Sequence, residues 1–464
     1  MEMAARSAAQ DSGTGDALLR RADTVEVVEL LSHRYPNAPL ALATRIGAEP
    51  RQTVQSAVGG NSPQMLVNQA CLDIAQGRAD IVVIAGTEAI HSRHVAHATG
   101  APLPWPAQAE GTPPPDRIVG INRPGNSPGE LARSLTMPVQ IYPIFETALR
   151  LALGSTADEH RTRVSELWAG FSAVAAANPH AWDQRVHTAS EIATPGPHNR
   201  WIGWPYTKLM VAYAGVDMAA ALIVTSASAA TSLGVPRDRW VFPWAGADCH
   251  DHWFVSERWD LCSSPAIAAN GRAALSHAGI GIDDIAHIDL YSCFPSAVQM
   301  GAAALGLGLD RPLTVTGGLS FCGGPLNNYV THSIAAMVDV LRGDPGSIGL
   351  VTALGWYATK HSIGIYSSEP PAREFGHFEP QDEVNVTPAR RAADDHVGAA
   401  TVEAWSVMHE RDGTPSLGLV ACLTPDGGRA WGNVREPSGL GALLSEEIGG
   451  HPATLAPDGG LDLA

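Results

Sequence analysis

One stretch limits the possible folds of this chain more than any other: residues 81–86 read Ile-Val-Val-Ile-Ala-Gly, without a polar side chain. A short run of this kind is typical of a strand that is buried on both faces of a sheet. It follows residues 61–77, where Leu66, Ala70 and Ile74 recur at intervals of four and predict a helix with one apolar face. A helix that leads directly into a fully buried strand indicates an α/β fold.

The same order of helix and buried strand recurs in the second half of the sequence. We expect helices at 265–280, 295–307 and 329–343, and strands at 285–291 and 349–353. Short connections between such elements predict parallel sheets covered by helices. The two regions, 1–115 and 236–368, therefore suggest an internally duplicated α/β fold, although the sequence shows no fixed-period repeat.

The remaining sequence divides into a central excursion and a C-terminal unit. The excursion is rich in Pro, Trp, Asn and His, with predicted helices at 139–153 and 161–177. From residue 399 apolar and polar residues alternate around Asp-Gly turns, which predicts hairpins of a small antiparallel β unit. We expect four regions: an N-terminal half (1–115), a loop excursion (116–215), the end of the N-terminal half with the C-terminal half (216–368), and an additional β domain with a tail (369–464).

Composition excludes several classes of protein. Thirty basic against 47 acidic residues give a formal net charge of −17, which argues against a nucleic-acid-binding protein or one that binds anionic membranes. No apolar run approaches the roughly 20 residues of a membrane span, and no hydrophobic signal core opens the sequence. Six cysteines occur without CxxC pairing, so we expect neither disulfides nor a metal site. These features predict a reduced, cytoplasmic protein.

Four ordered motifs resemble those of the thiolase superfamily over residues 1–368. The loop and helix from Gly60, which lead through Gly77 into a strand ending Gly-Thr-Glu-Ala, are similar to the nucleophile loop and central strand of that family. The other three are 206–221, 289–294 (Asp-Leu-Tyr-Ser-Cys-Phe, which resembles the His-Asp-Cys-Phe motif of sterol-carrier-type thiolases), and 317–326 with its two Gly-Gly pairs. The C-terminal unit looks like the extra domain of thiolase-like proteins type 1, a subgroup usually labelled acetyl-CoA acetyltransferases.

This resemblance implies a duplicated thiolase fold with five layers, α-β-α-β-α, a loop excursion and a small C-terminal β-barrel-like domain. Family members open with a strand before the first helix, whereas residues 1–12 already have a helical pattern. That strand is therefore either absent here or lost from the start. A sheet without it would leave unpaired backbone groups at its edge.

Thiolases use a nucleophilic cysteine, a histidine and a second cysteine, and this chain lacks all three at the matching positions. The family spacing places the nucleophile at Gly60, the Gly-His-Pro histidine at Gly324 and the second cysteine near Ala353, while Tyr291 replaces the histidine of His-Asp-Cys-Phe. The thiolate is what attacks the thioester, so we do not expect thiolysis or Claisen condensation through a cysteine.

Other side chains near these positions remain candidates for chemistry. The candidate catalytic residues are Tyr291, Cys322 and Cys293. Tyr291 either matches an oxyanion-hole position of the family or is a packed core tyrosine. Neighbouring glycines would leave Cys322 accessible, whereas Cys293 is better explained as a buried inert thiol. The predicted substrate-binding residues are Gly60, Asn61, Ser62, Gly324, Asn327, Gly355, Lys360 and His361. Among these, Ser62 and Asn327 would serve equally well as helix caps, and Lys360 either as a phosphate ligand or as a solvated side chain.

The resemblance implies three functions. The first is a protein of acyl-CoA acyltransferase ancestry that binds CoA or an acyl-CoA as ligand, without a covalently bound cofactor. The second is a retro-aldolase-type lyase in which Tyr291 acts as acid or base with Cys322, His332 or Lys360 as a second ionisable group. The third is a non-catalytic scaffold that binds partners through its β domain. A homodimer or a small β-domain partner is also expected from the family.

Overall fold

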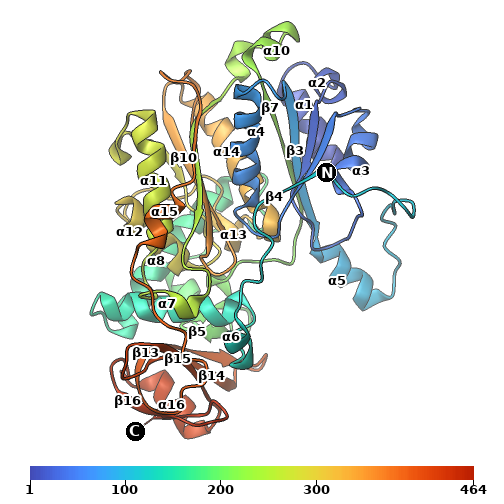
Figure 1. Ribbon diagram of the computed structural model, residues 1–464. Coiled ribbons are helices and arrows are strands. Elements are labelled where there is room, and N and C mark those ends of the chain that lie inside the picture. Colours follow the sequence, from blue (N-terminus) through green and yellow to red (C-terminus); the bar gives the residue numbers. More distant parts are fainter. Residues whose placement is uncertain (464) are drawn as a thin grey trace.

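The computed structural model describes residues 1–463. Its main body consists of two five-stranded sheets with helices on both outer sides and between them (Figure 1). Two helices form the layer between the sheets, α4 (Ser62–Ala75) and α14 (Tyr329–Gly343), and both contact strands of the two sheets. The architecture is therefore the α-β-α-β-α arrangement expected from the sequence.

The first sheet has the strand order β4-β2-β1-β3-β7. Its strands are β1 (Thr24–Val27), β2 (Gln52–Ser56), β3 (Ile81–Ala89), β4 (Arg117–Val119) and β7 (Asp217–Thr225). Strands β1 to β4 run parallel, and β7 pairs antiparallel with β3 from Ile81↔Thr225 to Ala89↔Asp217. Strand β7 is consequently an edge strand with one unpaired side.

The second sheet has the order β12-β8-β11-β10-β9. Its strands are β8 (Phe242–His250), β9 (His287–Asp289), β10 (Ile348–Gly355), β11 (Lys360–Ser367) and β12 (Gly376–Phe378). Strand β11 pairs antiparallel with β10 on one side and with β8 on the other. The sheets are thus mixed, and the prediction of parallel sheets was wrong, because four residues between β10 and β11 allow only a hairpin return.

The predicted helices are present with small shifts of their ends. The helices of the main body and excursion are α1 (Glu2–Asp11), α2 (Ala17–Arg20), α3 (Ala38–Ile46), α5 (Ile90–Thr99), α6 (Pro128–Ala132), α7 (Pro138–Ala152), α8 (Ala157–Ala177), α9 (Ala189–Ala193), α10 (Ala227–Ser232), α11 (Pro265–Ala278), α12 (Pro295–Leu305) and α13 (Gly318–Phe321). Short 3-10 turns lie at Lys208–Met210, Arg237–Arg239, Val255–Glu257, Ile282–Asp284 and Leu326–Asn328. Local caps explain several starts: Thr156 with Glu159 forms a capping box for α8, and the Ser264 hydroxyl accepts from the Ile267 N–H in α11.

The strand predicted at 285–291 is shorter than expected. Strand β9 ends at Asp289, because the Leu290 N–H donates to the Leu313 carbonyl and the Tyr291 N–H donates to the Thr352 hydroxyl at 2.9 Å. These bonds turn the backbone out of the sheet. Tyr291 is thereby placed beyond the end of the strand.

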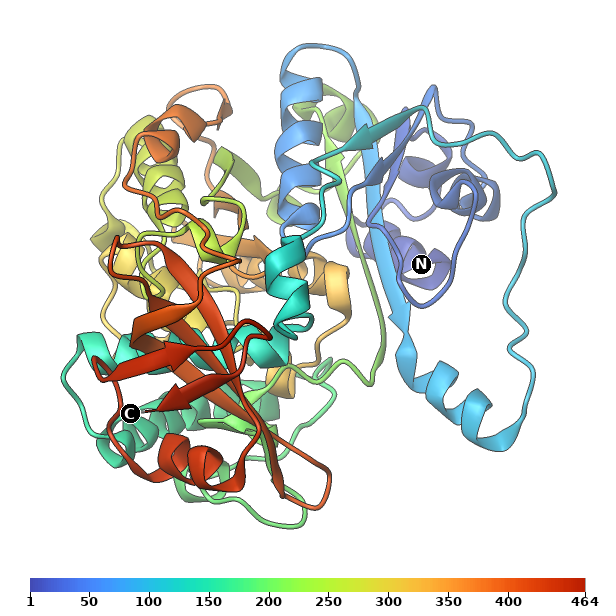
Figure 2. The ribbon, with the colours of Figure 1, turned by 60° about the horizontal axis from the view of Figure 1, so that its bottom comes forward.

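The C-terminal unit is an open antiparallel sheet that lies beneath the main body in Figure 1 and comes to the front in Figure 2. It contains β13 (Gly398–His409), β14 (Pro415–Leu423), β15 (Arg429–Val434), β16 (Pro452–Leu455) and β17 (Leu461–Leu463), with α15 (Gln381–Asn385) before it and α16 (Pro437–Ser445) packed on it. The excursion adds β5 (Trp201–Trp204) and β6 (Tyr206–Thr207), which the sequence did not predict, to the same sheet. The sheet is not closed, so the expected barrel-like form is corrected to an open sheet.

Within residues 1–463 no helix is both long and apolar enough to cross a lipid bilayer.

Candidate functional site

The loop between β2 and α4 forms the centre of the candidate site. It contains Gly59, Gly60 and Asn61, all buried. A Cβ atom at Gly60 would lie well inside 3.0 Å of both the Tyr291 hydroxyl oxygen and the Leu354 carbonyl oxygen, a separation that real Cβ atoms essentially never show. The Tyr291 side chain therefore occupies the space into which a side chain at position 60 would point.

Tyr291 is held at this position by its backbone and its ring. Its N–H donates to the Thr352 hydroxyl at 2.9 Å, and its ring packs edge-to-face on Tyr329 with centroids 5.7 Å apart. The residue is 8% exposed, and no hydrogen bond to its hydroxyl is found among residues 1–463. Burial raises the pKa of Tyr291 well above its ordinary value of 10.0, so the phenol stays protonated and acts as a hydrogen-bond donor.

Lys360 reaches the same loop from the first position of β11. Its Nζ donates to the Val58 carbonyl and, at 3.4 Å, to the Ile121 carbonyl, and it lies 5.9 Å from the centroid of the Trp356 ring. The side chain has no carboxylate within 4.0 Å in the described part of the chain, and the residue is 4% exposed. Burial lowers the pKa of Lys360 from 10.5 to about 8.

The position of Lys360 is unusual for this sequence, which contains lysine only at positions 208 and 360. A buried ammonium group that contacts carbonyl oxygens alone is costly, because neutral acceptors replace only part of its hydration. Such a charge at a cleft or loop is a candidate functional group.

Two asparagine side chains, Asn61 and Asn327, complete the polar surroundings of the loop, and a third, Asn328, lies against Gly86 of β3. The Asn61 Oδ1 is buried without a hydrogen-bond partner, and a Cβ added at Gly355 would lie 2.5 Å from it. Both polar atoms of the Asn327 side chain have hydrogen-bond partners. Its Oδ1 accepts from the Gly59 N–H at 3.0 Å, and its Nδ2 donates to the Glu29 carbonyl at 2.9 Å. The Asn328 Nδ2 is again buried without a partner. Unsatisfied groups of this kind indicate that a water or a ligand completes the site.

Two of the predicted substrate-binding residues, Ser62 and His361, bond to other groups of the protein rather than pointing into the site. The Ser62 hydroxyl donates to the Ala57 carbonyl at 2.7 Å and closes the loop before α4, rather than capping the helix. His361 faces away from the loop, because side chains alternate along β11, and its Nε2 lies 3.1 Å from the Asp251 carboxylate. His361 is thus separated from the Gly60 loop.

The predicted cysteine nucleophiles are unsuited to that role in this structure. Cys293 is buried, and burial raises the pKa of its thiol to about 12. Cys322 is only 2% exposed and has a pKa raised to about 12 by burial, so the accessibility expected from its glycine neighbours is not found. A thiol with such a pKa holds almost no thiolate at neutral pH.

Cys322 and His332 lie together, but not at the Gly60 loop. Both line a cavity beside β7, where burial lowers the pKa of His332 to about 4. They therefore do not supply the second ionisable group that a lyase using Tyr291 would need. Lys360 is the group of the three that touches the loop.

Gly324 lies at the entrance of the other central helix, three residues before Asn327, whose Oδ1 accepts from the Gly59 N–H. Its N–H donates to the Tyr213 carbonyl at 2.9 Å, and the neighbouring Ala212 N–H donates to the Cys293 carbonyl at 3.1 Å. A Cβ at Gly324 would lie 3.4 Å from its nearest neighbours, close to an ordinary contact. The segment that carries Gly324 is therefore linked to the segment after Tyr291.

The assembled site offers a neutral donor, a buried cation and unpaired amide atoms, without a reactive nucleophile. Sequence reasoning missed Thr352, which accepts from the Tyr291 N–H, and Trp356, whose ring lies beside the Lys360 ammonium group. These residues have no motif of their own and reach the loop only through long-range packing. No cluster of His, Cys, Asp and Glu suited to a metal ion occurs among residues 1–463.

Comparison with known proteins agrees with this geometry. The fold and the arrangement of the two central helices define a member of the thiolase superfamily. A crystal structure described as a monomeric SCP2-thiolase-like protein type 1 from Mycobacterium smegmatis matches with a TM-score of 0.86 and 33% identity, covering 100% of this chain and 94% of that one. Residues 379–460 match the family described as the thiolase-like protein type 1 additional C-terminal domain. The chain belongs to the thiolase-like proteins of type 1.

More distant structures share the fold alone. Human mitochondrial 3-ketoacyl-CoA thiolase matches with a TM-score of 0.54 and 15% identity, over 80% of this chain and 92% of that one. The Ltp2-ChsH2(DUF35) aldolase matches with a TM-score of 0.57 and 19% identity, over 76% and 88% of the two chains. A search among curated proteins returned no match.

Proposed function

We propose that this protein binds the thioester of CoA or an acyl-CoA at the Gly60 loop, without transferring the acyl group to a cysteine. The observation that carries this proposal is the Tyr291 hydroxyl, which fills the space beside Gly60 and has no hydrogen-bond partner among the described residues. A protonated phenol can donate to a thioester carbonyl but cannot act as an acyl acceptor in the way of a thiolate.

Lys360 and Asn61 support binding of a group with negative character. A buried ammonium without a carboxylate partner favours a partially or fully anionic ligand, because the ligand replaces lost hydration. The unpaired Asn61 oxygen accepts a hydrogen bond from a ligand or a water molecule. Together with the Tyr291 donor, these groups fit a polarised carbonyl better than an apolar chain.

Isothermal titration calorimetry with CoA and acetyl-CoA tests the proposal on the unmodified protein and two variants. We expect saturable binding of acetyl-CoA, and about a fivefold to tenfold loss in Tyr291→Phe, the effect of one net hydrogen bond. Tyr213→Phe removes the hydroxyl of an exposed tyrosine and serves as the matched control, with affinity unchanged. Absence of binding, or equal affinity in Tyr291→Phe, would contradict the proposal.

A carbon–carbon lyase is the second candidate, and Lys360 is the observation that favours it. With a pKa of about 8, this lysine has a neutral fraction near neutral pH and could accept a proton while Tyr291 donates one. The fold similarity to the Ltp2-ChsH2(DUF35) aldolase supports the same class. Release of an aldehyde or ketone from a 3-hydroxyacyl-CoA, abolished in Lys360→Met and retained in Lys208→Met, would establish this function; no release would exclude it for that substrate.

A further inference from the structure

The turn between β10 and β11, residues 356–359, has a backbone that needs support from the rest of the protein. Trp356 and Ala358 have φ angles of 59° and 53°, a left-handed conformation that residues other than glycine rarely adopt. Such residues persist where the surrounding structure fixes them. The turn leads directly into Lys360 and so sets the direction from which this side chain reaches the Gly60 loop.

Two buried side chains hold this turn. The Tyr142 hydroxyl, from α7, donates to the Trp356 carbonyl at 3.0 Å and accepts from the Ala358 N–H at 2.9 Å. The Arg258 guanidinium donates to the Thr359 hydroxyl at 2.9 Å, and Arg258 is only 4% exposed. One support therefore binds the start and middle of the turn, and the other binds its end.

The segment that carries Arg258, residues 255–259, is held in turn by the C-terminal domain. Arg429, the first residue of β15, is fully buried. Its guanidinium donates to the Val255 carbonyl at 3.1 Å and to the Arg258 carbonyl. Two bonds of 2.6 Å to the Glu403 carboxylate on β13 fix the orientation of the Arg429 side chain.

Further hydrogen bonds connect the same domain to both supports. The Trp431 indole N–H donates to the Ser256 hydroxyl at 2.8 Å, within the segment 255–259. The Thr147 hydroxyl on α7 donates to the Trp405 carbonyl of β13 at 2.8 Å. The two elements that hold the turn are thus both bonded to the C-terminal domain.

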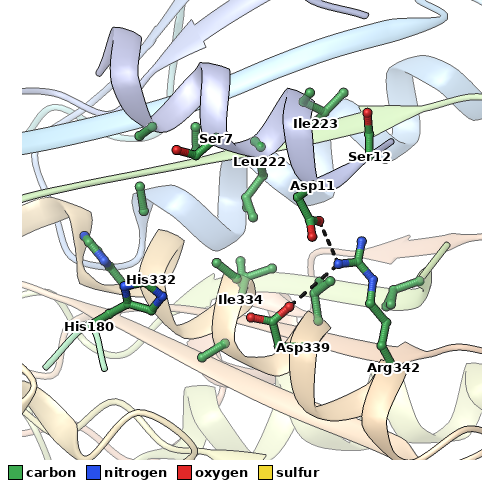
Figure 3. A pocket seen from close by; sticks show the side chains of 18 of the residues that line it. Ser7, Asp11, Ser12, His180, Leu222, Ile223, His332, Ile334, Asp339 and Arg342 are labelled. Atoms are coloured by element: carbon green, nitrogen blue, oxygen red, sulfur yellow. Dashed lines mark hydrogen bonds and ion pairs between the residues drawn. The ribbon is translucent and has the colours of Figure 1, made fainter. Parts of the chain in front are cut away.

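A second arginine that joins separate elements has different surroundings. Arg342 of α14 pairs with Asp11 of α1 at 2.7 Å and with Asp339 at 3.7 Å, beside the cavity at β7 (Figure 3). The side chains of these partners are 43% and 74% exposed, and exposed ion pairs contribute little. Arg429 is desolvated, so its hydrogen bonds constrain their partners more strongly. Arg342 is therefore a suitable control for Arg429.

We propose that Arg429 is a positioning residue: it holds the segment 255–259, so that Arg258 fixes the turn and Lys360 reaches the Gly60 loop. The C-terminal domain is then part of the support of the candidate site rather than a separate module. This proposal rests on the role of Lys360 in the proposed function. The surroundings of Lys360 can be measured without ligand, so failure of acetyl-CoA binding is distinguishable from failure of this proposal.

The pKa of Lys360, followed by NMR in protein with isotope-labelled lysine, tests the proposal. In Arg429→Met we expect this pKa to rise from about 8 by at least about 0.5, because a loosened turn lets water reach the ammonium group. Arg342→Met should leave it unchanged. An unchanged Lys360 pKa in Arg429→Met, or an equal rise in Arg342→Met, would overturn the proposal.

A milder pair of variants decides the question if Arg429→Met does not fold. Trp431→Phe and Trp405→Phe each remove one indole hydrogen bond of the C-terminal domain. The first bond goes to Ser256 and the second to the Leu443 carbonyl within the domain. We expect the Lys360 pKa to rise in Trp431→Phe alone. A rise in both variants, or in neither, would contradict a specific role of the bonds to the segment 255–259.

The last link to the turn is tested at Thr359. Thr359→Val removes the hydroxyl that accepts from Arg258 and should raise the Lys360 pKa, whereas Thr359→Ser keeps that hydroxyl and should preserve the pKa. Equal effects of the two variants would exclude the Arg258 bond as the support of the turn.

Discussion

The two central helices begin in similar ways but in different surroundings. Helix α4 begins shortly after Gly59–Gly60. Helix α14 follows Gly323–Gly324, from which one 3-10 turn, Leu326–Asn328, separates it. At Gly60 a side chain would collide with the Tyr291 hydroxyl and the Leu354 carbonyl, whereas at Gly324 a Cβ would lie 3.4 Å from its neighbours. Two halves with the same chain path can therefore differ in whether a reactive side chain has room at the helix entrance.

The comparison also shows which groups stand at the first entrance in place of a cysteine. At the first entrance the space is filled by a protonated phenol from the other half of the molecule, and a buried lysine contacts the same loop. At the second entrance the glycine faces backbone and a small side chain. The first entrance thus carries the polar groups of the candidate site.

The largest expected effect comes from adding one carbon atom at each entrance. Gly60→Ala should lower the free energy of unfolding by about 3 kcal/mol or more, because backbone at Leu354 cannot move aside as a flexible side chain would. Gly324→Ala is the matched variant and should cost less than about 1 kcal/mol. Urea denaturation of both proteins measures the difference, and equal losses would remove the distinction between the entrances.

The second prediction concerns the charge of Lys360. Its pKa of about 8 in the folded protein lies below the ordinary 10.5, so between these values the unfolded chain binds more protons and stability rises with pH. Below pH 8 the cost of the buried charge is complete. Lys360→Met should therefore stabilise the protein by about 3 kcal/mol at pH 7, with a gain that shrinks as the pH rises above 8.

Lys208→Met is the control for this charge and should change stability little at any pH. Urea denaturation at several pH values measures both variants. Because the sequence holds two lysines, selective isotope labelling of lysine also allows each pKa to be followed by NMR. A Lys360 pKa near 10.5 would contradict the expected burial of its charge.

A smaller effect is expected from the hydroxyl that positions Tyr291. Thr352→Val leaves the Tyr291 N–H without its acceptor and should cost about 1 kcal/mol of stability. It should also weaken acetyl-CoA binding, because Tyr291 is less firmly placed beside Gly60. Thr44→Val, at an exposed position on α3, should leave both the unfolding midpoint and the affinity unchanged; a similar loss in both variants would assign the effect to threonine replacement in general.

Much of the fold could be predicted from local patterns. The buried run at 81–86, the helical spacings and the Asp-Gly hairpins each depend on residues close in sequence, and the corresponding elements are present. The direction of β7 could not be predicted locally, because its antiparallel neighbour β3 ends at Ala89, far from Asp217 in the sequence. The direction of β11, in contrast, follows from the short turn after β10. The pairing of β5 with β13 joins segments about 200 residues apart and leaves no local signal.

The sequence allowed several residues of the candidate site to be named, but not the contacts that these residues make. The resemblance to the thiolase superfamily implied that Gly60, Tyr291 and Lys360 lie near one pocket, and the structure brings all three to one loop. Spacing could not show that Cys322 would be buried beside β7, since its burial depends on α8 and α14 packing around it. Nor could it show that the Tyr291 hydroxyl fills the space at position 60.

A crystal structure of the protein grown with acetyl-CoA would test the central claim most directly. We predict that the thioester carbonyl oxygen lies about 3 Å from the Tyr291 hydroxyl, beside Gly60, with no bond from the acetyl group to a cysteine sulfur. An acetylated cysteine, or a thioester bound away from the Gly60 loop, would contradict the account.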